Sequence, residues 1–210
     1  MPQIHCSDLH AGDIMLKVSD GSLTSKIISG GQSVFGKVNK DIVHAGVMAN
    51  QETIIEAQAA GVSSNSLLLE DQNYKYAYYV FRCTDGAVAQ GAGDCAKLLA
   101  DTHREAEVLP YSKLKAALSL FGGGGGQSRS RIDLDQFWTG IFEGSSTGLF
   151  CSQLVVLIYQ LVGEQFRLSG TVKPTLFSQN DKKMNPADLA SALNASPNFV
   201  EVGWMFSRER

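Results

Sequence analysis

Three residues of this chain have side chains that could together carry out nucleophilic catalysis: Cys151, His44 and Glu56. Cys151 directly precedes a segment with the apolar spacing of a buried helix. A thiol at a helix N-terminus lies among free backbone N–H groups and the positive end of the helix dipole, which both favour the nucleophilic thiolate. Because free cysteine is also commonly a small core residue, a purely structural role for Cys151 stays open.

The helix that should position Cys151 is indicated by a periodic set of apolar residues. The repeat consists of Leu154, Val155, Ile158, Leu161 and Val162. These positions fall on one face of an α-helix. We predict that the helix begins at or near Cys151 and ends at Gly163, since glycine often follows the last helical residue.

His44 and Glu56 are expected on the two arms of a β-hairpin. Residues 42–49 and 53–58 are both rich in strand-forming residues, and the polar residues 50–52 between them are typical of a turn. Residues on paired strands contact each other across the ladder, so the hairpin predicts that these two side chains are neighbours. A carboxylate beside an imidazole fixes its tautomer and favours its charged form.

Other motifs suggest different chemistry but lack the structural context it needs. Ser146 lies in a Gly-x-Ser-x-Gly pattern, yet a predicted helix precedes it where a serine-hydrolase elbow requires a strand. The glycine-rich segment 31–37 resembles a phosphate loop without the Ser or Thr that should follow Lys37. A second glycine-rich segment, 91–96, falls inside a predicted helix. We therefore expect no cofactor and no metal ion.

The remaining pattern predicts an α+β fold in one domain spanning residues 1–210, with an antiparallel sheet packed on the nucleophile helix. Besides the hairpin, the expected strands cover residues 14–18, 76–83 and 199–204. The expected helices cover residues 22–29, 86–105, 113–121 and 133–142, and a further helix should start at Pro186. Residues 61–66 are expected to form a polar loop. The glycine-rich segment at about 122–148 is interpreted as an insertion.

Composition excludes several classes of protein. The chain has 210 residues, 44% of them hydrophobic and 19% charged, which is typical of a globular protein with one sizeable core. Its net charge of -3 gives no electrostatic reason for nucleic-acid binding. No apolar run reaches the ~20 residues of a transmembrane helix, and the first residues lack the features of a signal peptide. The four cysteines are far apart, which argues against a zinc ribbon or a disulfide framework.

Six short motifs, taken in order, resemble the circularly permuted branch of the NlpC-type papain-like hydrolases, the YiiX-like proteins related to lecithin:retinol acyltransferase. They are Gly12-Asp13-Ile14-Met15-Leu16, His44-Ala45-Gly46-Val47, Ile55-Glu56-Ala57, Pro110-Tyr111, Phe150-Cys151-Ser152-Gln153-Leu154-Val155 and Asn185-Pro186-Ala187-Asp188-Leu189. In ordinary papain-like enzymes the cysteine precedes the histidine, whereas in this permuted branch, as here, the histidine comes first. The resemblance does not extend to the segment at about 122–148.

The resemblance implies a permuted papain-like fold and a Cys-His-Glu triad. Cys151 would be the nucleophile, His44 the base and then the acid, and Glu56 the residue that orients His44. Members of this family place His, Glu, Asp, Asn or Gln at the third position, so Glu56 is acceptable there. Tyr111 and Ser152 would be candidates for binding substrate or the oxyanion.

The substrate implied by the resemblance is a peptidoglycan stem peptide, cleaved at an amide bond. Such a hydrolase, synthesised in the cytoplasm without a signal peptide, resembles an antibacterial effector that a dedicated secretion system delivers to the periplasm of target cells. An immunity protein would then be its partner in the producing cell. Two alternatives stay open: a lipid acyl hydrolase or acyltransferase, and a non-catalytic binding module of the same fold.

Overall fold

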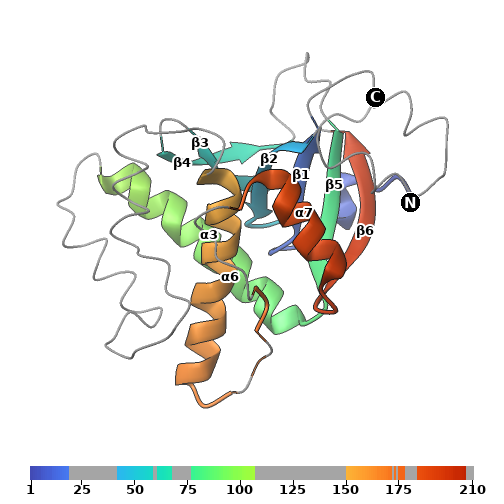
Figure 1. The fold of residues 1–210 in the computed structure, drawn as a ribbon. Helices are drawn as coiled ribbons and strands as arrows, with labels where there is room; N and C mark the ends of the chain where they lie inside the picture. The colour runs from blue at the N-terminus through green and yellow to red at the C-terminus, as the bar shows by residue number, and fades with distance from the viewer. Residues whose placement is uncertain are drawn as a thin grey trace.

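The protein has an α+β fold in which a six-stranded antiparallel sheet packs against three helices (Figure 1). The computed structural model describes residues 1–18, 42–58, 61–67, 77–106, 150–171, 173, 175–177 and 184–206. The antiparallel sheet and its packing on the helix that carries Cys151 agree with the fold class expected from the sequence.

The strands follow the order β4-β3-β2-β1-β5-β6 across the sheet, and every neighbouring pair is antiparallel. Their bounds are Ile14–Val18 (β1), Ile42–Met48 (β2), Thr53–Gln58 (β3), Gly61–Ser66 (β4), Ala77–Cys83 (β5) and Phe199–Phe206 (β6). The predicted strands at 14–18, 42–49, 53–58, 76–83 and 199–204 are thus confirmed within one or two residues at each end.

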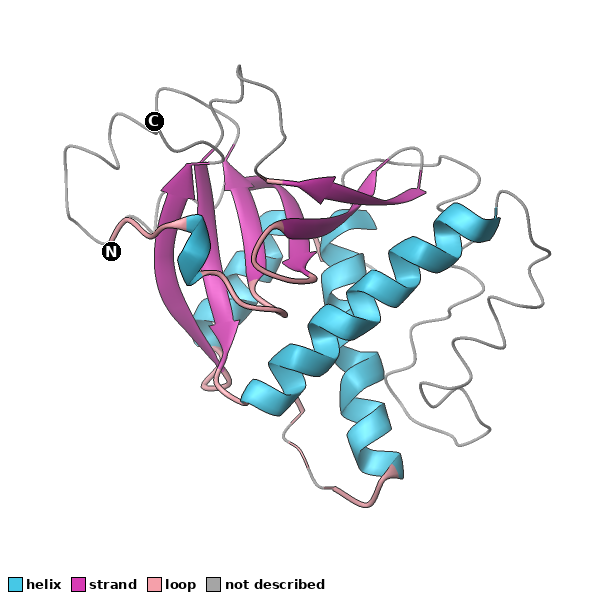
Figure 2. Ribbon diagram, turned by 180° about the vertical axis from the view of Figure 1, so that it is seen from behind, coloured by secondary structure: helices cyan, strands magenta, loops and turns pink. Residues whose placement is uncertain are grey.

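Apolar side chains cover both faces of the sheet. On one face, the sheet packs on α3 (Gly86–Ala106), α6 (Phe150–Leu168) and α7 (Pro186–Ala195), and α3 and α6 cross one another in both ribbon views (Figures 1 and 2). The short 3-10 helix η1 (Cys6–Asp8) lies against the other face (Figure 2). A smaller core cluster that includes Leu9, Met48 and Ile54 fills that side.

The prediction of a polar loop at residues 61–66 is wrong, because this segment forms the edge strand β4. It pairs with β3 from Thr53↔Ser66 to Gln58↔Gly61. Serine, asparagine and glycine are poor strand formers. Here the backbone hydrogen bonds that β3 offers outweigh the local preference, which is a tertiary effect that the sequence of the segment does not reveal.

The predicted end of the nucleophile helix at Gly163 is also wrong, since α6 continues to Leu168. A single interior glycine costs only about 1 kcal/mol relative to alanine, so it does not stop a helix that buries a long apolar face. The turn after α6 instead contains Gly170, whose φ of 78° allows the left-handed conformation that ends many helices. Its N–H donates to the Arg167 carbonyl over 3.1 Å.

Helix α3 begins and ends close to its predicted bounds, and the last helix begins at the predicted residue. Helix α3 spans Gly86–Ala106, so the glycine-rich segment 91–96 is helical, as expected. Helix α7 begins at Pro186 after the N-cap residue Asn185, whose side chain accepts from the Asp188 N–H over 2.9 Å. The Asp188 carboxylate in turn accepts a hydrogen bond from the Asn185 N–H, which completes a capping box.

Several sequence expectations lie outside the residues that the structure describes. These are the helices at 22–29, 113–121 and 133–142, the phosphate-loop-like segment 31–37, Tyr111, Ser146 and the expected insertion at about 122–148.

Candidate active site

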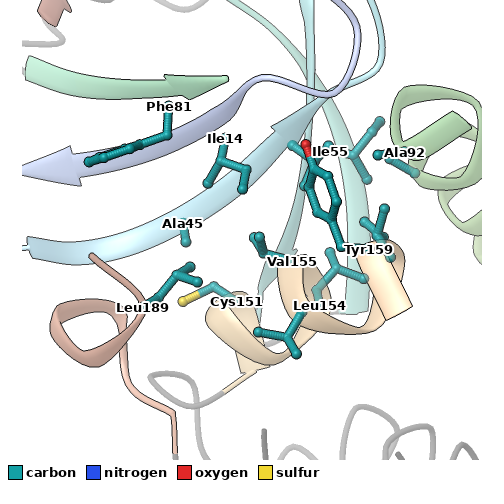
Figure 3. Close-up of a cluster of buried hydrophobic side chains, with 14 of the residues drawn as sticks. Ile14, Ala45, Ile55, Phe81, Ala92, Cys151, Leu154, Val155, Tyr159 and Leu189 are labelled. Atoms are coloured by element: carbon teal, nitrogen blue, oxygen red, sulfur yellow. The ribbon is translucent and has the colours of Figure 1, made fainter. Parts of the chain in front are cut away.

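Cys151 is the second residue of α6, so the structure places it in the first turn of the helix, as predicted. Its side chain is fully buried and projects toward Ala45 of β2 and Leu189 of α7 (Figure 3). The thiol therefore lies where the first turn of α6 meets the sheet. Apolar neighbours alone would make Cys151 an ordinary core cysteine, but the His44 side chain hydrogen-bonds to it.

His44 lies on β2 next to an irregularity in the strand. On one side of this point Lys17 of β1 pairs with His44, and on the other Val18 pairs with Ile42, so Val43 is an extra, bulged residue. Val43 is 45% exposed, while the side chain of His44 is 19% exposed. A β-bulge changes the direction in which neighbouring side chains point and is common next to active sites.

Glu56 reaches His44 diagonally across the hairpin. The residue directly opposite Glu56 is Gly46, two positions beyond His44. A diagonal neighbour is within reach of a long side chain. Glu56 Oε1 lies 3.3 Å from His44 Nε2 as an ion pair, and neither atom makes a well-aligned hydrogen bond within the part of the chain that the structure describes. The prediction that the two side chains are neighbours is confirmed, although their pairing is diagonal.

Gly46 provides the space for this diagonal contact. A Cβ atom at this position would lie 2.9 Å from Glu56 Cγ and 2.8 Å from the side chain of Ile54. Both distances are shorter than any normal contact, so every other residue at position 46 would displace one of these side chains. The absence of a side chain at Gly46 thus allows the Glu56 chain to cross toward His44.

The electrostatics of the site favour a protonated His44. Burial opposes the charge, but hydrogen bonds to Cys151 and Glu56 and the charges of both residues outweigh it and raise the pKa of His44 from 6.5 to about 9. Burial likewise raises the pKa of Glu56, but the hydrogen bond and charge of His44 lower it overall, helped by Asn65 and Lys17. An imidazolium between a sulfur and a carboxylate is the consistent charge state at neutral pH.

Two other buried cysteines show what a structural thiol looks like in this protein. Burial, with the charge of Asp94, raises the pKa of Cys95 on α3 to about 12. Burial also raises the pKa of Cys83 on β5. Both groups stay protonated and unreactive at neutral pH. Among these three buried cysteines, Cys151 is distinguished by an imidazole partner.

The structure also describes Ser152 but not Tyr111, the two residues considered for substrate or oxyanion binding. The buried Ser152 hydroxyl donates to the backbone carbonyl of Met184, shortly before α7. This bond connects the first turn of α6 to the segment leading into α7 and helps to fix the position of Cys151. Oxyanion binding by Ser152 stays a prediction, and Tyr111 lies outside the described residues.

Asn65 is a polar residue near the site that the sequence did not reveal. It lies on β4, and its Nδ2 donates to Glu56 Oε2 over 2.9 Å. The same atom lies 3.3 Å from Ser63 Oγ. The only available signal was the polar run Ser63-Ser64-Asn65, which became meaningful once residues 61–66 were known to form a strand.

Within the described part of the chain, no group of three or more His, Cys, Asp and Glu side chains could hold a metal ion.

Among the helices that the structure describes, none combines the length and apolar character needed to span a bilayer.

Comparison of the whole chain with protein families, with curated proteins and with solved structures found no match.

Proposed function

We propose that this protein is a cysteine hydrolase with a circularly permuted papain-like fold, acting through Cys151, His44 and Glu56. The observation that carries the proposal is the contact of one histidine with a thiol at a helix N-terminus and with a buried carboxylate. Nucleophile, base and orienting group in mutual contact are the common pattern of nucleophilic catalysis. The chain order, histidine before cysteine, is that of the permuted branch.

The proposed reaction proceeds through an acyl-enzyme. The Cys151 thiolate attacks the carbonyl carbon of an amide, and the negative oxygen of the tetrahedral intermediate accepts a hydrogen bond from a backbone N–H such as that of Cys151. When the C–N bond breaks, imidazolium His44 gives its proton to the leaving amine. Neutral His44 then takes a proton from the attacking water, and breakage of the thioester restores the thiolate and the imidazolium.

The first test measures whether the Cys151 thiol is activated and reachable. Iodoacetamide reacts with thiolates, so peptide mass spectrometry should show that Cys151 is alkylated much faster than Cys95 and Cys83. His44→Ala should slow the alkylation of Cys151 at neutral pH and leave the other two cysteines unchanged. If Cys151 were as unreactive as Cys95, it would be a core residue and the catalytic proposal would be wrong.

The proposed substrate is a peptidoglycan stem peptide, as the family resemblance implies, with delivery as an antibacterial effector neutralised by an immunity protein. The test is mass spectrometry of muropeptides after incubation of the protein with purified sacculi. We expect a muropeptide product whose mass corresponds to hydrolysis of one amide bond and which is absent with Cys151→Ala and His44→Ala.

In parallel, phospholipid vesicles and fatty-acyl esters test the alternative of a lipid acyl hydrolase. If fatty acid is released from the lipid substrates while the sacculi stay intact, the cell-wall assignment is wrong and the cysteine mechanism still stands.

A further inference from the structure

We propose that Asn65 is a positioning residue of the site, holding the Glu56 carboxylate so that one oxygen faces His44. This inference rests on the proposed function and adds a fourth member to the triad. Glu56 has two carboxylate oxygens, and the structure gives each a different partner: Oε1 lies 3.3 Å from His44 Nε2, and Oε2 accepts from Asn65 Nδ2 over 2.9 Å.

The need for an anchor follows from the length of the glutamate side chain. Glutamate has three rotatable bonds, and its terminal torsion is broad, so a diagonal approach to His44 is compatible with many carboxylate orientations. The Asn65 amide donates to the oxygen that does not face His44, and this restricts rotation of the carboxylate about its last bond. A hydrogen bond to a charged acceptor is roughly twice as strong as one between neutral groups.

The edge of the sheet fixes Asn65 in this place. In β4, Ser63 pairs with Glu56 and Asn65 pairs with Ile54, so Asn65 is the diagonal neighbour of Glu56 on the same face. The Ser63 hydroxyl donates to the Glu56 carbonyl over 3.4 Å and lies 3.3 Å from Asn65 Nδ2. Ser63 therefore contacts the backbone of Glu56, while Asn65 contacts its side chain.

The charges around this network favour an ionised Glu56 and a protonated His44. Cys151 of α6 and Glu56 of β3 face His44, and the charge of Lys17 on β1 acts on Glu56. Asn65 carries no charge, so its effect on His44 has to pass through the ionised Glu56 carboxylate. An experiment can therefore distinguish this indirect role of Asn65 from a direct contact with the imidazole or with substrate.

The chain supplies a matched control on the same strand. Ser64 is adjacent to Asn65, is exposed and points to the opposite face of the sheet. Ser64→Ala should therefore test the general effect of altering the edge strand. Asn65→Leu removes the donor while keeping a similar side-chain volume, and Asn65→Ala serves as a second variant if the leucine disturbs folding. Circular dichroism verifies that each variant is folded.

The decisive measurement is the titration of His44 by NMR, assigned with His44→Gln, because it requires no substrate. Loss of the anchor should lower the pKa of His44 in Asn65→Leu and Asn65→Ala, because a carboxylate that is no longer held toward Nε2 stabilises the imidazolium less. Ser64→Ala should leave it unchanged. An unchanged His44 titration in both Asn65 variants would overturn the proposal.

A double-mutant cycle tests whether Asn65 acts through Glu56. Asn65→Leu should reduce kcat/KM by about tenfold in the wild-type background, as expected for the loss of one hydrogen bond to a charged group. In the Glu56→Ala background the same change should have no further effect. Equal losses in both backgrounds would mean that Asn65 acts elsewhere. If the protein hydrolyses nothing, the proposed function fails, while the His44 titration still decides the role of Asn65.

Discussion

A thiol beside an imidazole has two forms with the same number of protons, a neutral pair and an ion pair, and the third residue decides between them. Glu56 places a carboxylate 3.3 Å from His44 Nε2, which stabilises the imidazolium. The distance is longer than the ~2.7–2.9 Å of a tight charge-assisted hydrogen bond. Catalytic contacts are commonly this loose before substrate binds.

The raised pKa of His44 predicts the alkaline limit of activity. In the proposed mechanism the leaving amine takes its proton from imidazolium His44, so kcat/KM should fall as the pH rises through about 9. Alkylation of Cys151 by iodoacetamide needs only the thiolate and should persist above this pH. Parallel pH profiles of hydrolysis and alkylation measure the difference. Loss of hydrolysis already at the ordinary histidine value of 6.5 would contradict the ion-pair arrangement.

The same shift has a consequence for folding stability. A group whose pKa is higher in the folded state stabilises the fold fully below its unfolded value and loses this contribution as the pH rises through the folded value. For His44 that interval runs from 6.5 to about 9. The stability difference between the wild type and His44→Gln, measured by urea unfolding, should therefore shrink as the pH increases across this interval.

Replacing Glu56 by glutamine should weaken the site without eliminating it. An amide can still hold the imidazole but supplies no charge, so the imidazolium loses part of its stabilisation. We expect kcat/KM to fall by about 10²-fold to 10⁴-fold, as for the same carboxylate-to-amide change in other triads. His44→Ala should reduce it to the background of Cys151→Ala. Full activity in Glu56→Gln would show that Glu56 is only a structural residue.

At the scale of the elements, the hairpin of β2 and β3 brings Glu56 to His44 because position 46 carries no side chain. Gly46→Ala should displace Glu56 or Ile54, since the new Cβ would lie 2.8–2.9 Å from both side chains. We expect a loss of about 1–3 kcal/mol in the free energy of unfolding together with reduced activity. Urea unfolding and kcat/KM measure the two effects.

Gly163 supplies the control for this prediction. It lies inside α6, and a Cβ atom there would have no other atom within 4 Å. Gly163→Ala should therefore increase stability by roughly 0.5–1 kcal/mol through better helix propensity and leave activity unchanged. A similar loss of stability in both variants would mean that the space at Gly46 has no special role.

At the scale of the whole molecule, a buried ion pair joins the start of β1 to β5. Fully buried Asp13 accepts from Arg82 Nε over 2.8 Å and from Arg82 Nη2 over 2.7 Å, and it also accepts from the His10 N–H over 2.8 Å. The two residues are distant in sequence, and their ion pair connects the neighbouring strands β1 and β5. Breaking such a pair leaves an uncompensated charge.

Asp13→Asn should therefore destabilise the protein by about 3 kcal/mol in chemical unfolding, with Arg82 left partly unpaired. The matched control is the exposed Asp94 on α3, whose change to asparagine should alter stability by less than about 0.5 kcal/mol. Equal effects at the two positions would show that the buried pair contributes little to the fold.

The proposed cell-wall activity also makes a prediction about where the protein is toxic. Peptidoglycan lies outside the cytoplasmic membrane, so expression in the cytoplasm of a bacterial host should be harmless. Fusion to a periplasmic signal should make the host cells round up or lyse, which microscopy and culture turbidity measure. The Cys151→Ala change should abolish this toxicity. Toxicity of the cytoplasmic form would instead favour a cytoplasmic amide or a lipid as the substrate.

The sequence by itself determined the elements with strong periodic patterns. The apolar repeat after Cys151, the strand formers around His44 and Glu56, and the helix start at Pro186 all predicted real structure. These signals are local: each depends on side chains within a few residues along the chain. They were sufficient to place Cys151 at a helix start and His44 and Glu56 on adjacent strands.

Only the tertiary structure decided how these elements combine into a site. The diagonal contact of Glu56 with His44 depends on the register of β2 and β3 and on the empty position at Gly46. The strand β4, and with it Asn65, exists because β3 offers unpaired backbone groups to a segment with little strand propensity of its own. Helix α6 continues past Gly163 because packing along its apolar face outweighs the cost of one glycine. In each case the deciding interaction comes from a residue or strand that is not part of the local pattern.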